Sequence, residues 1–352
     1  MSQLFSPLRL RELEFKNRIF VSPMCQYSAQ DGIPNEWHLV HLGSRAVGGA
    51  ALVLVEATAV SPEGRISPAD TGIWSEAHTQ AFQPITAFIK SQGAVPGIQI
   101  AHAGRKASTD APWRGGKPLT EGAWQTIGPS PLAFGHYPAP REMTREDIQT
   151  TVDQFADAAR RSLEAGFEVI EIHMAHGYLL HEFLSPLSNL RADEFGGPLE
   201  ARAKFPLQVA EAVRRIWPAH LPVFVRISAT DWAENGGWDL AQSIQFSTWL
   251  RDIGIDLIDC SSGGLIPGVT IPVGPGYQVP FAAAVRKEAG IATGAVGMIT
   301  EPQQAEKIIT SGDADAVLLA RALLRDPYWP LHAAKALAAD TAWPVQYVRA
   351  KD

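Results

Sequence analysis

Residues 144–177 of the chain read TREDIQTTVDQFADAARRSLEAGFEVIEIHMAHG, and this stretch combines the two patterns that decide the fold. Residues 145–164 form an amphipathic helical pattern, with Thr144 as a helix N-cap and Gly166 just beyond the end. Residues 168–174 then form a nearly continuous apolar run, which is typical of a parallel strand covered on both faces. The stretch predicts one helix followed by one buried strand.

The same alternation extends along the whole chain. Short apolar runs rich in Val and Ile predict strands at residues 18–24, 51–58, 95–102, 168–174, 222–228, 257–261, 291–295 and 316–320. Amphipathic stretches predict helices at residues 37–47, 76–91, 145–164, 199–217, 241–252, 281–289, 302–310 and 327–338. Successive βα units predict an α/β fold, a single (β/α)8 TIM barrel over residues 1–352.

Two segments lie outside the minimal barrel. Residues 8–15 resemble a short hairpin that could close the bottom of the barrel. Residues 103–143 form a long segment rich in Gly, Pro and Trp. Loops of this length in a compact domain are usually functional or disordered. This one follows the third strand, on the face where barrel enzymes keep their active sites, and we interpret it as a lid or pocket wall.

Composition excludes several classes of protein. The 352 residues are 46% hydrophobic and 19% charged, and the net charge of -7 without a long basic run argues against a nucleic-acid partner. No window approaches the roughly 18 apolar residues that a membrane span needs. Cys25 and Cys260 indicate no disulfide framework, and the first residues lack the apolar region of a signal peptide. We therefore expect a soluble, cytoplasmic protein.

The C-terminal ends of barrel strands are where catalytic residues are expected. After strands six to eight, Gly263, Gly264, Gly297 and Arg321 predict a phosphate site, because glycines admit backbone N–H groups and arginine adds a cation. The alternative is that these glycines only close tight turns. Other polar or reactive residues at strand ends are Cys25, Tyr27, Gln99, His102, Arg105, His173, His176, Tyr178 and Arg226.

His173 and His176 have three readings. With His102 and His181 they could bind a metal ion, or one of them could serve packing. We favour paired donors that hold a carbonyl or nitro oxygen on which negative charge develops. Tyr178 could then protonate carbon, or could be an ordinary rim tyrosine.

Arg226 needs a partner inside a barrel, since its charge cannot be shed. Arg226 and Gln99 could satisfy each other, and Cys25 could be an ordinary buried cysteine. A flavin offers a better partner, with Arg226 at its N1/O2 edge and Gln99 at its pyrimidine edge.

Four runs carry a family resemblance: SPMCQYSAQDG (22–32), QIAHAGRKA (99–107), IEIHMAHGYLLHEFLSPLSNLRADEFGG (170–197) and RISATDW (226–232). They resemble the old yellow enzyme family of FMN-dependent ene reductases, and the resemblance covers essentially the whole chain. Met24–Cys25 and the C-terminal Gln346, Tyr347 and Arg349 resemble its thermophilic-like branch, which includes xenobiotic reductases.

The resemblance implies a set of roles. Residues that would hold FMN are Pro23, Met24, Cys25, Ala57, Gln99 and Arg226, with Gly264, Gly297, Ala320 and Arg321 at the phosphate. His173 and His176 would bind the substrate oxygen, Tyr178 would donate the proton, and Cys25 would tune the flavin and contact substrate. Tyr27 would line the substrate side. Arg349 would reach the active site of a neighbouring subunit, which implies a homodimer or a higher homo-oligomer.

Ala320 is one departure, because the family usually has Gly before this arginine. Alanine is acceptable here only if its φ angle is negative.

We hypothesise a ping-pong cycle in which NADPH or NADH reduces FMN and an enone, enal or nitroalkene reoxidises it. Arg and Lys on the long loop favour NADPH, and the absence of a G-x-G-x-x-G after a strand fits a nicotinamide that binds briefly. The alternatives are another flavin-barrel reductase, a metal-dependent barrel hydrolase that uses the histidines, and a non-catalytic binding barrel.

Overall fold

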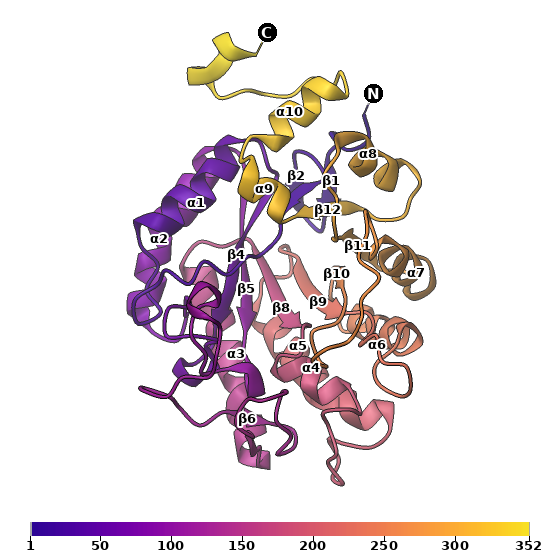
Figure 1. Ribbon diagram of the computed structural model, residues 1–352. Helices are drawn as coiled ribbons and strands as arrows, with labels where there is room; N and C mark the ends of the chain where they lie inside the picture. Colours follow the sequence, from indigo (N-terminus) through magenta and orange to yellow (C-terminus); the bar gives the residue numbers. More distant parts are fainter. Residues whose placement is uncertain (1, 352) are drawn as a thin grey trace.

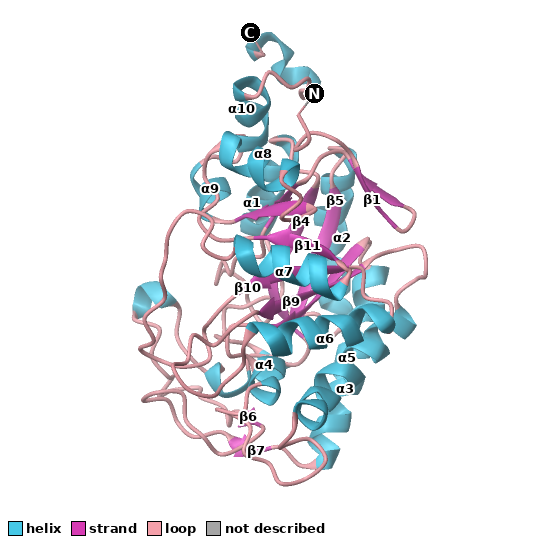
Figure 2. Ribbon diagram, turned by 90° about the vertical axis from the view of Figure 1, so that its right-hand side faces the viewer, coloured by secondary structure: helices cyan, strands magenta, loops and turns pink. Residues whose placement is uncertain are grey.

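The computed structural model describes residues 2–351, and its centre is a closed barrel of parallel strands (Figures 1 and 2). Each strand is hydrogen-bonded to its neighbours in the cyclic order β10-β11-β12-β3-β4-β5-β8-β9. The strands are β3 (Ile19–Val21), β4 (Leu52–Ala59), β5 (Val95–Ala101), β8 (Val169–Met174), β9 (Val223–Ser228), β10 (Leu257–Ser261), β11 (Ala292–Ala295) and β12 (Ala316–Leu319). The predicted (β/α)8 barrel is confirmed.

Helices surround the barrel, and most begin where the sequence predicts. They are α1 (Glu36–Val47), α2 (Glu76–Ser91), α3 (Arg145–Glu164), α4 (Leu179–Leu184), α5 (Leu199–Ile216), α6 (Leu240–Asp252), α7 (Val279–Ala289), α8 (Pro302–Thr310), α9 (Arg321–Arg325) and α10 (Trp329–Ala336). Thr144 caps α3 as predicted, since its hydroxyl accepts from the Asp147 N–H at 3.1 Å. Ser75 precedes α2, but its hydroxyl contacts His78 Nδ1 instead of a backbone amide.

Some predicted boundaries are wrong. The first strand ends at Val21 and not at Met24, so Pro23 to Cys25 lie in an irregular segment that is free to turn into the barrel mouth. The short helices α4 and α9 were not predicted, because five or six residues are too few for a helical period to stand out. The last predicted helix is shorter, since α10 spans Trp329–Ala336.

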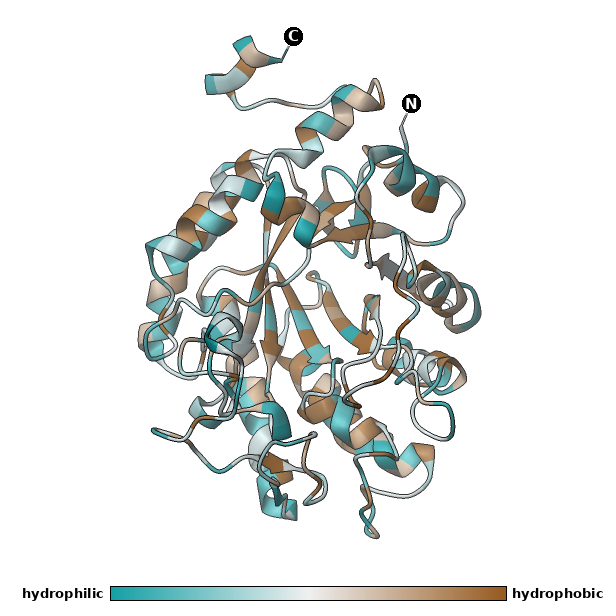
Figure 3. Ribbon diagram, in the orientation of Figure 1, coloured by the Kyte–Doolittle hydropathy of each residue, from teal (hydrophilic) through white to brown (hydrophobic). Residues whose placement is uncertain are grey.

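Apolar side chains fill the space between strands and helices, and Figure 3 shows the barrel strands as mostly hydrophobic. Polar residues interrupt this pattern toward the C-terminal strand ends. They include buried Gln99, Glu171, His173, Arg226 and Asp259. The interior is therefore apolar at one end and polar at the other, and the polar end is where a site can form.

The N-terminal hairpin closes the apolar end, as predicted. Strands β1 (Leu8–Leu10) and β2 (Leu13–Phe15) pair antiparallel. Phe15 is fully buried, with its ring centroid 4.9 Å from that of Phe20 and 6.5 Å from that of Phe224. Phe20 and Phe224 lie on barrel strands, so one hairpin side chain completes the core at the bottom.

The long segment 103–143 contains only short elements: η2 (Gly104–Lys106), η3 (Pro112–Arg114), β6 (Ile127–Gly128) and β7 (Arg141–Glu142). The remaining short elements are η1 (Pro62–Gly64) and η4 (Val345–Ala350). Both views place η4, at the C-terminus, near the N-terminus and at the opposite end of the molecule from β6 (Figures 1 and 2). Within residues 2–351, no helix has the length and apolar character needed to cross a membrane.

The buried ring of Phe15 gives a test of the closing hairpin. Phe15→Ala should lower the free energy of unfolding by about 3–5 kcal/mol, because it removes apolar contacts and leaves a cavity. Val40→Ala is the control, since Val40 is 67% exposed and should change stability by less than about 0.5 kcal/mol. Denaturant unfolding of both variants measures the difference. Equal free energies of unfolding for the two variants would contradict a closing role for the hairpin.

Candidate active site

The turn after β8 brings three predicted residues together. His173 ends the strand with Met174, and His176 and Tyr178 follow before α4. His176 Nδ1 lies 3.4 Å from His173 Nε2, and the Tyr178 ring stands edge-on to the His173 ring with centroids 5.1 Å apart. On the other side of its ring, His176 Nε2 lies 2.7 Å from Ser261 Oγ at the end of β10.

Burial sets the protonation of these groups. It lowers the pKa of His173 and of His176 well below the ordinary value, and the charge of Arg226 lowers both further. Burial also raises the pKa of the Tyr178 phenol well above its ordinary value. At neutral pH both imidazoles are therefore neutral, each with one N–H, and Tyr178 carries its proton. A hydroxyl proton donated by Ser261 to Nε2 would place the His176 proton on Nδ1, facing His173.

The segment carrying Cys25 and Tyr27 is held by a carboxylate from β4. Glu56 accepts a hydrogen bond from the Gln26 N–H at 2.7 Å, and its other oxygen lies 3.1 Å from His38 Nε2. Burial raises the pKa of Cys25 well above the ordinary value, so this cysteine is a thiol and not a thiolate. Glu56 was not among the predicted site residues, although an acidic residue inside the apolar run LVLVEATA is the signal for it.

Tyr27 is the outer member of that segment. Its φ angle is +48°, a left-handed conformation that is uncommon for a residue with a side chain. The Tyr27 ring meets the Trp113 ring edge-on at a centroid distance of 5.6 Å. Trp113 belongs to the long loop, so the loop contributes an aromatic wall beside a predicted substrate residue.

Two acidic residues inside the barrel were not predicted, and they show that one interpretation of Gln99 and Arg226 is wrong. Gln99 and Arg226 are not each other's partners. The Gln99 amide donates to Glu171 Oε1 at 2.8 Å, and Arg226 Nε lies 3.0 Å from Asp259 Oδ2. The signal was present, because Glu171 and Asp259 interrupt the apolar strands VIEIHM and LIDCS.

Two buried carboxyl groups thus share one guanidinium. Glu171 and Asp259 are fully buried, and burial raises the pKa of Glu171 to about 8 and that of Asp259 to about 6. The negative charge of Asp259 raises the pKa of Glu171 further, while Arg226 and the Gln99 hydrogen bond lower it. Arg226 balances one negative charge, and a bound proton balances the other.

The groups left over at the barrel mouth fit a flavin. Among the described residues, no hydrogen-bond partner is found for the terminal nitrogens of Arg226 or for the Gln99 carbonyl oxygen. Free donors on β9 and a free acceptor on β5 therefore lie on the two strands that flank β8. The pyrimidine edge of a flavin presents the complementary set, with acceptors at N1 and O2 and a donor at N3.

A cavity of about 260 Å³ lies at the ends of β11 and β12, where a phosphate was predicted. Gly297, Ala320 and Arg321 are among its lining residues. Ala320 has φ -105°, so the negative φ that alanine requires is present. Gly297 has φ +119°, and a Cβ there would lie 2.8 Å from Gln278 Nε2.

Gly264 does not line that cavity. A Cβ on Gly264 would lie 2.6 Å from His176 Cα, and one on Gly177 would clash with the Gly264 carbonyl. These glycines allow the turns after β8 and β10 to touch. A phosphate contact by Gly264 stays a prediction.

The long loop is anchored over this end of the barrel. Lys106 Nζ donates to the carbonyls of His176 at 2.8 Å and Gly264 at 3.0 Å. The Arg105 guanidinium donates to the carbonyls of Leu265 at 2.8 Å and Leu132 at 3.2 Å. Burial lowers the pKa of Lys106 to about 8. That the loop forms a lid or pocket wall stays a prediction.

The other two histidines that were considered as metal ligands, His102 and His181, accept hydrogen bonds from backbone amides. His102 Nδ1 accepts from the Gly104 N–H at 3.1 Å, and His181 Nδ1 accepts from the Gly177 N–H at 2.9 Å. Over the part of the chain that the structure describes, no cluster of three His, Cys, Asp or Glu side chains could hold a metal ion. Arg349 lies on exposed η4, away from this site.

Comparison with known proteins identifies the family. Residues 3–340 match the NADH:flavin oxidoreductase / NADH oxidase family. An NADPH dehydrogenase of Geobacillus sp. (strain WCH70) is 48% identical over 99% of this chain and 98% of its own length. The NADPH dehydrogenase of Bacillus subtilis (strain 168) is 47% identical over the same shares.

Solved structures agree. Morphinone reductase superposes with a TM-score of 0.81 at 25% identity, covering 97% of this chain and 91% of the other. The old yellow enzyme homologue from Zymomonas mobilis gives 0.79 at 27% identity, covering 99% and 96%. The chain belongs to the NADH:flavin oxidoreductase / NADH oxidase family. It is an FMN-dependent oxidoreductase that uses NAD(P)H, and the predicted resemblance is confirmed.

The shared proton of the interior carboxyls predicts a pH dependence. Because the folded pKa of Glu171 is raised to about 8 from 4.5, the folded state binds this proton more tightly than the unfolded state. The free energy of unfolding should therefore fall as pH rises from about 4.5 to 8. Glu171→Gln should flatten that fall. Denaturant unfolding at fixed FMN concentration from pH 5 to 9 measures it, with exposed Glu211→Gln as the control. An unchanged slope in Glu171→Gln would show that Glu171 carries no raised pKa.

Proposed function

We propose that the protein is an ene reductase, which reduces the activated C=C bond of α,β-unsaturated carbonyl or nitro compounds at the expense of NADPH. FMN, held by residues that include Gln99 and Arg226, would supply the hydride-transfer chemistry that links NADPH to the substrate β-carbon. The observation that carries the proposal is the group of His173, His176 and Tyr178 at the end of β8, beside the flavin-complementary groups of Gln99 and Arg226.

The histidine pair supports binding of one substrate oxygen. His173 Nε2 and His176 Nδ1 are 3.4 Å apart and face each other. An oxygen about 2.9 Å from both nitrogens would accept two hydrogen bonds. Because both rings are neutral, they would polarise the oxygen as N–H donors without protonating it. A carbonyl or nitro oxygen, which gains negative charge as the β-carbon accepts hydride, fits this pair.

Tyr178 supports delivery of a proton to the α-carbon. Its raised pKa keeps the phenol protonated at neutral pH, so it is a proton donor at rest. The Lys106 ammonium lies 5.0 Å from the Tyr178 ring centroid. A cation at this distance would stabilise the phenolate left after transfer, until solvent returns the proton.

We assign the remaining roles by position. Residues proposed to hold FMN are Pro23, Met24, Cys25, Ala57, Gln99 and Arg226 at the ring, with Gly264, Gly297, Ala320 and Arg321 at the phosphate. Cys25 would contact the flavin and the substrate as a neutral thiol, and Tyr27 would line the substrate side.

Arg349 supports a homodimer. No residue of η4 is buried, and the tail projects from the barrel at the end opposite the long loop (Figure 1). Arg349 would therefore act in the site of a second subunit, where its guanidinium would face the substrate.

The first test follows the two half-reactions by visible absorption. Under anaerobic conditions NADPH should bleach the flavin bands of the purified protein, and 2-cyclohexenone should restore them. Tyr178→Phe should keep the first step and slow the second by about 10²–10⁴-fold, because only the second needs the proton. Ser247→Ala, a buried hydroxyl on α6, is the matched control. Full-rate reoxidation of Tyr178→Phe would remove Tyr178 as the proton donor, and failure of the enone to reoxidise the wild type would remove the ene-reductase proposal.

The subunit contribution has its own test. Arg349→Ala should raise the KM for the enone with little change in the rate of flavin bleaching by NADPH. Mixed dimers of Arg349→Ala with Tyr178→Phe should recover one working site, because each chain supplies what the other lacks. Sedimentation should give a dimer, and a monomer with full activity would contradict the assignment.

A further inference from the structure

The turn that carries the proposed catalytic residues has an uncommon backbone. His176 has φ +60° and Gly177 has φ +70°, so two consecutive residues are left-handed. Glycine adopts this conformation freely, but a histidine does so at a cost in free energy. Outside contacts must therefore hold the turn, and the position of His176 and Tyr178 depends on them.

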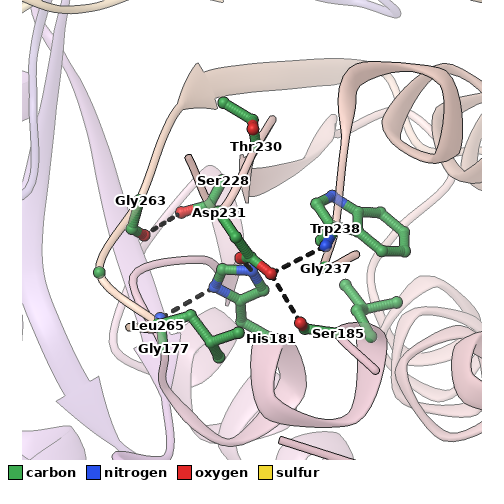
Figure 4. A network of polar contacts seen from close by, with 12 residues as sticks. Gly177, His181, Ser185, Ser228, Thr230, Asp231, Gly237, Trp238, Gly263 and Leu265 are labelled. Atoms are coloured by element: carbon green, nitrogen blue, oxygen red, sulfur yellow. Dashed lines mark hydrogen bonds and ion pairs between the residues drawn. The ribbon is translucent and has the colours of Figure 1, made fainter. Parts of the chain in front are cut away.

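Buried side chains bind both amides of this turn, and Figure 4 shows the bond from the Gly177 amide to His181. The His176 N–H donates to Ser228 Oγ at 2.9 Å, and the Gly177 N–H donates to His181 Nδ1 at 2.9 Å. The Ser228 hydroxyl donates onward to the Gly263 carbonyl at 2.8 Å. The turn is thus fixed by an acceptor on β9 and an acceptor on α4.

His181 can accept at Nδ1 only in one tautomer. A neutral imidazole has one protonated and one unprotonated nitrogen, so acceptance at Nδ1 places the proton on Nε2. His181 Nε2 lies 3.0 Å from Asp231 Oδ1, and neither atom has another polar partner among residues 2–351. The two side chains are fully buried. A carboxylate at Nε2 favours the proton there.

The carboxylate of Asp231 is itself oriented. Its Oδ2 accepts from the Ser185 hydroxyl at 2.6 Å and from the Trp238 N–H at 2.8 Å. Burial raises the pKa of Asp231, but the hydrogen bonds from His181, Ser185 and Trp238 outweigh it and lower the pKa below the ordinary value. Two donors thus hold one oxygen and leave the other for His181 (Figure 4).

We propose that Asp231 is a positioning residue for substrate reduction. It keeps His181 in the Nε2-protonated tautomer, and His181 in turn holds the Gly177 amide and with it the placement of His176 and Tyr178. This inference rests on the proposed roles of His176 and Tyr178, although neither Asp231 nor His181 would touch substrate.

Asp231→Asn separates this role from simple packing. Two donors point at the Oδ2 position, so the amide oxygen should take that position and the amide nitrogen should face His181. The nitrogen would donate to Nε2 and move the ring proton to Nδ1, against the Gly177 N–H. Two opposed donors would displace the turn. A displacement of about 1 Å near reacting groups can cost about 100-fold.

His181→Asn provides the matched background. An asparagine carbonyl oxygen occupies about the place of Nδ1 and can accept from the Gly177 N–H without help from residue 231. If Asp231 acts through the tautomer of His181, Asp231→Asn should strongly weaken phenol binding in the wild-type background. In the His181→Asn background the same substitution should change phenol binding by less than about twofold. A purely structural role for Asp231 predicts similar losses in both backgrounds.

The measurements use the FMN-loaded protein. Titration with 4-hydroxybenzaldehyde, followed by the change in flavin absorption, reports the oxygen pocket, because its phenol oxygen stands in for the polarised substrate oxygen. Nitrogen-15 NMR of labelled histidines reports the tautomer of His181, whose signals are those lost in His181→Asn. We expect an Nε2-protonated ring in the wild type and in Ser185→Ala, and an Nδ1-protonated ring in Asp231→Asn with about 100-fold weaker binding.

The outcomes are distinct. An Nδ1-protonated or doubly protonated His181 in the wild type overturns the proposal without any variant, even if Asp231→Asn fails to fold. Equal losses in the wild-type and His181→Asn backgrounds also overturn it. If the wild type does not bind the phenol, the proposed oxygen pocket fails, while the tautomer measurement still decides the role of Asp231.

Discussion

The contact between two turns is the constraint on which the site depends. The turn after β8 and the turn after β10 approach so closely that a side chain at Gly177 or Gly264 would enter the backbone of the other turn. This contact brings His176, on the turn after β8, within 2.7 Å of Ser261 on β10. Lys106 then binds a carbonyl of each turn, so a single ammonium group secures both.

Charge inside the barrel follows a second constraint. Arg226 brings one positive charge to the mouth, and two carboxyl groups lie beneath it. Asp259 forms an ion pair with the guanidinium, its Oδ2 lying 3.0 Å from Nε, and Glu171 orients the Gln99 amide by accepting its N–H. The terminal nitrogens of Arg226 and the carbonyl oxygen of Gln99 are the groups that remain for the proposed FMN site. In the proposed site, the two buried acids would therefore determine which donors and acceptors are offered to the flavin.

Much of this architecture was predictable from the sequence. The strand and helix periods gave the barrel, because each strand is apolar on both faces and each helix on one. Residues at strand ends gave most of the candidate site, since barrel topology gathers those ends on one face. Thr144 and the hairpin at residues 8–15 were also recognisable from local patterns.

The residues that were not predicted from the sequence owe their roles to contacts with distant parts of the chain. Glu56, Glu171 and Asp259 stand alone in apolar runs, and their partners lie on other strands, on a helix or in the irregular segment after β3. His181 was considered as a metal ligand, but it instead bonds the Gly177 amide, a contact that depends on the left-handed turn. The glycine at position 264 was assigned to phosphate, and only the structure shows its contact with His176. Periodicity cannot show such pairings.

The anchoring of the long loop has a consequence for evolution. The side chains of Arg105 and Lys106 donate their hydrogen bonds to main-chain carbonyls of Leu132, Leu265, His176 and Gly264, and both cations also lie over the Phe134 ring. Carbonyl oxygens persist whatever residue occupies a position. Residues 107–143 can therefore diverge, and with them the surroundings of Trp113, without loss of these four hydrogen bonds. Selection or directed mutagenesis of substrate range can work in this segment while the chemistry beneath it stays unchanged.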